Sequence, residues 1–123
     1  MNKEFIPYEQ ALELKKLGFN EECFGAYIDK ILIIEDDWLY STNQDTFIES
    51  SNFTAPLYQQ AFRWFREKYG WVGGIRKLSS QGNNTIVGHF YKDDNNSFMM
   101  FGETYEDCEL NALKHLIEIA KNK

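Results

Sequence analysis

Apolar residues recur at helical spacing in two stretches of the chain. In residues 54–69 one broad arc of a helical wheel is apolar, and Arg63, Arg66 and Glu67 lie opposite. The members of this arc are Leu57, Tyr58, Ala61, Phe62, Trp64, Phe65 and Tyr69. A second apolar arc runs from Tyr105 to Ala120. The pattern predicts two amphipathic helices.

Residues typical of helix ends support both assignments. For the first helix we expect an N-cap at residues 54–55, Pro56 in the first turn and Gly70 at the end. For the second helix, Thr104 and Asp107 approximate a capping box, with Asp in place of the usual Glu. A start and a stop are therefore predicted for the first helix, and a start for the second.

Alternation of side chains between the two helices predicts a meander of three strands. We expect strands over residues 71–78, 85–92 and 97–102, joined by turns at 79–84 and 93–96. In the middle strand, Ile86, Gly88 and Phe90 fall on one face, and Val87, His89 and Tyr91 on the other. The pair Gly73–Gly74 is expected to weaken the first strand or to mark a bulge.

The N-terminal part of the chain predicts a further helix and a hairpin. Pro7 suits the first helical position, and Gly18 suits a left-handed C-cap. Residues 27–28 and 31–34 are strand-like, and with the acidic turn 35–37 and a returning strand over 38–40 they indicate a hairpin. The polar stretch 41–53 is typical of a connecting loop.

These elements predict an α+β fold in one domain spanning residues 1–123. Residues 1–53 would supply the N-terminal helix, hairpin and loop, and residues 54–123 an α-β-β-β-α unit. The unit has the element order of double-stranded-RNA-binding domains, which carry basic residues at the start of their last helix. Here Glu106, Asp107 and Glu109 occupy those positions and would repel phosphate. The order therefore indicates an architecture rather than an RNA-binding function.

Charge is distributed unevenly along the chain. The net charge is −6, but residues 1–55 carry four Lys and eleven Asp or Glu, whereas residues 56–123 carry nine Lys or Arg and eight Asp or Glu. Such asymmetry can mark an electrostatic partner surface or charges that pack within the chain. The longest apolar run, Ile31–Ile34, is too short to span a bilayer, and no signal peptide is seen. We expect a cytoplasmic protein.

The sequence gives no signature of catalysis, a metal or a cofactor. The spacing between the histidines, His89 and His115, and the cysteines does not require a Cys-His catalytic pair. Cys108 falls on an apolar helix face typical of a buried thiol. Gly73–Gly74 lacks the context of a phosphate loop, and residues 93–96 lack the spacing of a calcium loop. We therefore expect a protein without cofactor or enzymatic activity.

Three segments, residues 5–12, 55–68 and 104–110, carry a resemblance to a known family. They resemble a family of small proteins of phages and prophage regions whose function is not known. The resemblance spans most of the chain, and its middle segment is the most specific. It implies an accessory role in a bacterial host cell and supplies no activity, ligand or catalytic residue.

Two functional hypotheses follow. The first is a non-enzymatic binding protein acting on a host or phage protein, and its candidate surface is Glu35, Asp36, Asp37, Trp38 and Tyr40. The alternative is a nucleic-acid or nucleotide-binding module that uses a basic patch, with an aromatic side chain stacking on a base. The candidate residues of that patch are Arg63, Arg66, Arg76 and Lys77, with Trp64 or Trp71 for stacking. The high aromatic content, 16%, also leaves room for a homodimer contact.

Overall fold

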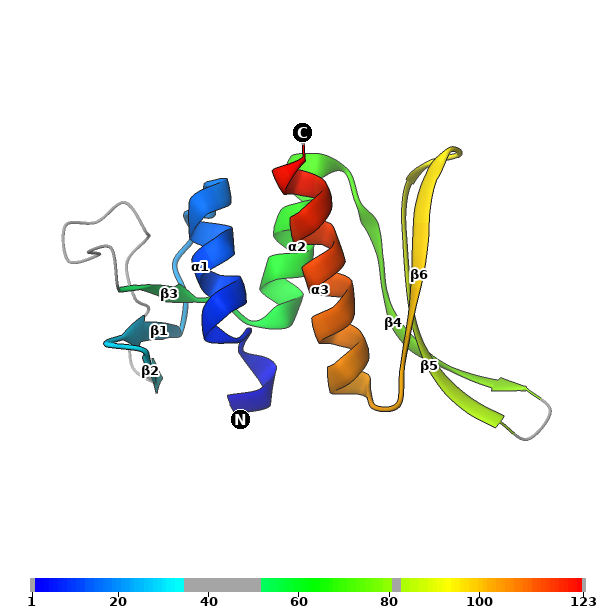
Figure 1. Ribbon diagram of the computed structural model, residues 1–123, viewed down its shortest axis with the longest axis horizontal. Coiled ribbons are helices and arrows are strands. Elements are labelled where there is room, and N and C mark those ends of the chain that lie inside the picture. The colour runs from blue at the N-terminus through cyan, green and yellow to red at the C-terminus, as the bar shows by residue number, and fades with distance from the viewer. Residues whose placement is uncertain (1, 35–51, 81–82, 123) are drawn as a thin grey trace. The chain divides into compact units, whose positions relative to one another are not determined.

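A computed structural model describes residues 2–34, 52–80 and 83–122. It confirms the α+β class, with antiparallel strands in two separate three-stranded sheets (Figure 1). The chain divides into two compact units, residues 1–60 and 61–123. The division falls inside the helix α2, Tyr58–Tyr69, and not before it. The single-domain organisation stays a prediction.

The first unit begins with a 3-10 helix, Asn2–Glu4, and the helix α1, Tyr8–Leu17. Gly18 takes the predicted left-handed conformation with φ 101° and ends α1. Pro7 is the residue before the first helical position, one place earlier than expected, and its φ of −65° directs the chain into the helix.

The hairpin of the first unit turns earlier than the sequence indicates. Strands β1, Gly25–Ile28, and β2, Ile31–Ile34, pair antiparallel across Asp29 and Lys30. Both turn residues have positive φ, 52° and 69°, as a tight two-residue hairpin requires. The strand character expected at residues 27–28 and 31–34 is confirmed, but the two segments pair with each other, and the turn between them was missed because it lacks the glycine that usually marks it. The predicted turn 35–37 and strand 38–40 lie outside the described residues.

A strand also replaces the predicted N-cap of α2. Residues Phe53–Ala55 form β3, which pairs antiparallel with β1 and completes a sheet of order β2-β1-β3. All three side chains are buried, and the Ile6 N–H donates to the Pro56 carbonyl at 3.0 Å. The helix α2 consequently begins only at Tyr58. Burial and strand pairing here outweigh the local helix-start signal.

Aromatic side chains form the core of the first unit. Tyr8 of α1 meets Tyr27 of β1 and Phe53 of β3, with ring centroids 5.4 and 5.1 Å apart. The Tyr27 hydroxyl donates to the Ile6 carbonyl at 2.8 Å, so the buried ring keeps its polar group satisfied. One ring from each of three elements thus fixes α1 on its sheet.

The predicted meander is present in the second unit. Strands β4, Val72–Ser80, β5, Asn83–Asp93, and β6, Asn96–Gly102, form an antiparallel sheet of order β4-β5-β6. The helix α3, Tyr105–Lys121, follows directly. Thr104 caps α3 by accepting from the Asp107 N–H at 3.0 Å, as predicted, and Gly70 with φ 82° follows the last residue of α2.

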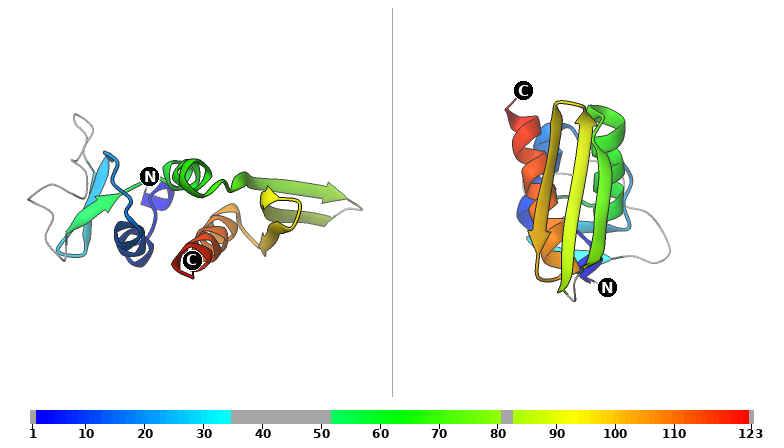
Figure 2. Two further views of the ribbon diagram at one scale, coloured as in Figure 1. Left: turned by 90° about the horizontal axis from the view of Figure 1, so that it is seen from above. Right: turned by 90° about the vertical axis from the view of Figure 1, so that its right-hand side faces the viewer.

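Helical side chains cover one face of this sheet, which we call the inner face. Phe90 and Phe98 are paired across β5 and β6 and stack with centroids 5.4 Å apart. Phe62 of α2 contacts Phe90, and His115 of α3 contacts Phe98. In Figure 2 the helix α3 lies behind the sheet in the right-hand view. The inner face therefore carries the core of this unit.

The adjacent glycines of β4 differ in their surroundings. The register between β4 and β5 is unbroken at Gly73 and Gly74, so the predicted bulge is absent there, and the one irregularity of the sheet lies between Tyr91 and Asp93. A Cβ added at Gly73 would meet the His89 carbonyl oxygen at 2.0 Å, whereas a Cβ at Gly74 would meet nothing within 4 Å.

We predict that Gly73→Ala destabilises the protein strongly, by about 2 kcal/mol or more, because the methyl group must displace the backbone of β5. Gly74→Ala, the matched control, should change the free energy of unfolding by less than about 0.5 kcal/mol. Urea denaturation of both variants measures the difference. Equal stability of the two variants would contradict the close approach of β4 to β5 at Gly73.

Candidate functional site

The residues proposed from sequence for protein binding cannot be placed. Glu35, Asp36, Asp37, Trp38 and Tyr40 all lie outside the described residues. This candidate surface therefore stays a prediction.

The basic residues proposed for nucleic-acid binding are exposed, but they do not all lie on one surface. Arg63 and Arg66 lie one turn apart on α2 and share a side of that helix. Arg76 and Lys77 are consecutive in β4, and successive residues of a strand point to opposite faces. The structure thus supports an exposed arginine pair on α2, while Arg76 and Lys77 do not share a face.

Neither tryptophan proposed for base stacking is accessible. The exposed fractions of Trp64 and Trp71 are 7% and 6%. Trp64 packs edge-on against Phe65, and Trp71 contacts Phe98 on the inner face. The stacking role assigned to these indoles is therefore corrected: both contribute to packing, because the apolar arc of α2 and the end of that helix turn them inward.

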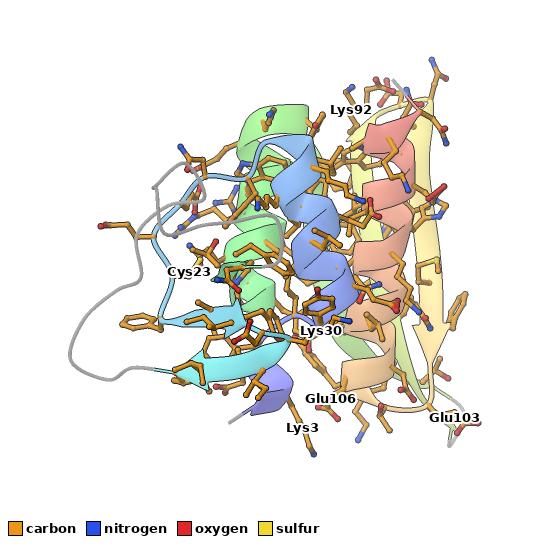
Figure 3. All side chains as sticks on the ribbon, turned by 60° about the vertical axis from the view of Figure 1, so that its left-hand side comes forward. Lys3, Cys23, Lys30, Lys92, Glu103 and Glu106 are labelled. Atoms are coloured by element: carbon orange, nitrogen blue, oxygen red, sulfur yellow. The ribbon has the colours of Figure 1, made fainter. Side chains whose placement is uncertain are left out.

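Both cysteines are buried free thiols. Burial raises the pKa of the Cys23 thiol, which lies between α1 and β1 (Figure 3), to about 12. Burial also raises the pKa of the Cys108 thiol, whose Sγ donates to the Met100 carbonyl at 3.3 Å. Burial in both cases disfavours the thiolate, which is the reactive form of a cysteine.

The two histidines belong to different surroundings. His115 lies against Phe98 on the inner face, and His89 lies on the opposite face beside Tyr91. Cys108 and His115 are seven residues apart on α3, roughly 10 Å along its axis, which is too far for a hydrogen bond. Within the second unit, therefore, Cys108 is not paired with either histidine.

No group of acidic, cysteine and histidine side chains suited to a metal ion occurs within residues 2–34, 52–80 and 83–122. Asp93 instead accepts from the Asn95 N–H and from the Asn96 side chain, which makes residues 93–96 the predicted turn. These hydrogen bonds lower the pKa of the Asp93 carboxyl. In the same described ranges, no helix is long and apolar enough to cross a membrane.

Large apolar side chains are exposed on the second face of the β4-β5-β6 sheet. The exposed fractions are 41% for Val72, 50% for Tyr91, 47% for Met99 and 58% for Phe101. Val87, which is fully buried, and His89 lie between them, and the face carries one basic residue, Arg76. We call this set, Val72, Arg76, Val87, His89, Tyr91, Met99 and Phe101, the outer face.

The strand register makes the outer face one continuous patch. Val72 pairs with Tyr91, His89 with Met99, and Val87 with both Arg76 and Phe101. Each of these cross-strand sets forms one row of the outer face, and neighbouring rows are two residues apart, about 7 Å along the strands. The rings of His89 and Tyr91 are 6.1 Å apart, so neighbouring rows touch. The right-hand view of Figure 2 looks onto this side of the sheet.

The sequence of β6 contains a pattern that could have predicted the outer face. A strand with one face in water normally alternates apolar and polar residues. In β6, Phe98 and Met100 are directed to the inner face, yet Met99 and Phe101 between them are equally apolar. Apolar residues on both faces of a strand are the pattern that could have predicted an apolar second face.

Comparisons with known proteins add no relative to this picture. No model of a known family matches the chain, and no protein of curated function or solved structure matches it.

Proposed function

We propose that this protein is a non-enzymatic binding protein that acts on a host or phage protein through the outer face. One observation carries the proposal: Val72, Tyr91, Met99 and Phe101 are between 41% and 58% exposed on a single sheet face. Contiguous exposed apolar patches on small proteins commonly mark interaction sites. The resemblance to phage and prophage proteins supplies the cellular context.

The composition of the outer face favours a protein partner. The centres of protein interfaces are depleted in charge and enriched in aromatic residues, Met and Arg. The outer face has Tyr91, Phe101, Met99 and one charged side chain, Arg76. A partner with an apolar surface and an acidic residue placed to meet Arg76 fits this chemistry.

Packing on the inner face preorganises the side chains of the outer face for binding. Phe90 and Phe98 are held by α2 and α3 on one side, and the same two strands present Tyr91, Met99 and Phe101 on the other. A packed sheet orders these side chains before binding, which lowers the entropy cost of association. The patch therefore depends on the core directly beneath it.

We predict that Tyr91→Glu weakens partner binding at least tenfold, because a carboxylate at the centre of the contact would be desolvated. A photo-crosslinking residue at position 91, introduced in infected bacterial cells, identifies the partner. Binding of the purified pair is then measured for both variants by calorimetry. Asn95→Glu, which adds the same charge in the exposed 93–96 turn, is the matched control and should change affinity less than twofold.

Two results would overturn the proposal. In the first, Tyr91→Glu binds the identified partner as tightly as the wild type. In the second, crosslinking at position 91 captures no protein that the purified wild type binds.

A nucleic-acid-binding function is the second candidate, and the exposed pair Arg63 and Arg66 on α2 favours it. Opposing it, Glu103 and Glu106 lie exposed where β6 joins α3 (Figure 3), and no exposed tryptophan accompanies the arginines in α2. Repulsion between these carboxylates and phosphate weakens binding in that part of the unit. The protein partner therefore has the stronger support.

We expect no salt-dependent binding of short labelled RNA or DNA, single-stranded or duplex, in fluorescence anisotropy at low and moderate salt. The nucleic-acid function predicts the opposite: affinity that falls steeply with salt and is lost in the double variant Arg63→Ala, Arg66→Ala. Lys114→Ala, an exposed lysine of α3, serves as the control for a general loss of positive charge. Binding that follows this second pattern would place the nucleic-acid function first.

A further inference from the structure

Strand β6 forms an edge of its sheet with little to prevent further pairing. Among the described residues, it has a strand neighbour on the β5 side alone. Its sequence, Asn-Ser-Phe-Met-Met-Phe-Gly over 96–102, contains no charged residue and no proline. Natural edge strands are usually protected by such residues, by bulges or by shortness. The β6 pairing with β5 is regular from Ser97 to Gly102.

The opposite edge of the same sheet shows the contrast. Strand β4 carries Arg76 and Lys77 in its middle, and both side chains are exposed. Charged residues on an edge oppose the approach of a second strand of the same kind. One edge of this sheet is therefore protected by charge, and the other is not.

We infer that β6 pairs antiparallel with β6 of a second copy of this chain, which joins two three-stranded sheets into one of six strands. A two-fold axis through Met99 would bring Met99 opposite its own copy, Ser97 opposite Phe101, and Phe98 opposite Met100. Side chains that face each other across such a pair lie on the same side of the sheet. The two outer faces would then form one larger surface.

A second copy suits this edge because β6 is complementary to itself. In an antiparallel pair of identical strands the residue on the axis meets its own copy, so a charge near the axis would lie close to the same charge of the other copy. Residues 96–102 are uncharged throughout, so no such repulsion arises. The pairs on the inner side, Phe98 with Met100, are both apolar. On the outer side the small Ser97 stands opposite the large Phe101, which avoids crowding two large side chains.

This inference concerns an edge, whereas the proposed function concerns a face, so the two can fail separately. Met99 is the residue to change, because it is 47% exposed and its replacement leaves the core intact. Met99→Lys would bring two ammonium groups together across the axis. Val72→Lys, on the outer face of β4 and 41% exposed, is the matched control at the other edge.

Sedimentation velocity at increasing protein concentration tests the pairing. We expect the wild type and Val72→Lys to dimerise, and Met99→Lys and Met99→Glu each to dissociate at least tenfold more readily. An equimolar mixture of the Lys and Glu variants should recover the dimer, because opposite charges then meet at the axis. Circular dichroism melting confirms that each variant is folded.

Each alternative outcome overturns the inference in a recognisable way. A wild type that stays monomeric at several hundred micromolar excludes a second copy as the occupant of the edge. Equal loss of the dimer in Val72→Lys and Met99→Lys would indicate contact between faces. A dimer that is unaffected by Met99→Lys, or that the mixed variants fail to recover, would place the contact away from Met99.

Discussion

The second unit depends on one constraint: successive residues of a strand point to opposite faces, and the helices cover a single face. Phe90 and Phe98 stack on the covered face and are held there by Phe62 and His115. The same strands must therefore present their other residues outward. The helices do not cover the side chains of Tyr91, Met99 and Phe101, and the proposed function rests on this exposed apolar set.

The remaining titratable groups of the described residues are dispersed. The two thiols are buried, with raised pKa values, and the two histidines lie on opposite faces of the sheet. The proposed function therefore rests on the apolar area of the outer face. The glycines at positions 88 and 102 allow α3 to pack closely on the inner face, because a side chain there would meet Cys108 of α3.

Sequence patterns predicted the second unit well and the first unit partly. The meander, the Thr104 cap and the Gly70 helix end follow from local signals that the tertiary structure reinforces. The Asp29–Lys30 turn was missed because neither residue is glycine, and β3 because strand pairing with β1 overrides an apparent helix start. The outer face was missed because its residues gather only when three strands align. The buried tryptophans show the same limit, since composition cannot tell which aromatic rings are inside.

The central claim is that Val72, Tyr91, Met99 and Phe101 of the outer face are open to solvent while the inner face is packed. Two consecutive methionines test it directly, because Met99 is directed outward and Met100 inward. Dilute protein is treated briefly with hydrogen peroxide, and sulfoxide formation at each residue is followed by tandem mass spectrometry. The account predicts that Met99, the more exposed of the two, is oxidised faster than Met100, roughly several-fold. Equal rates, or a protected Met99, would show that another part of the chain covers the outer face and would contradict the account.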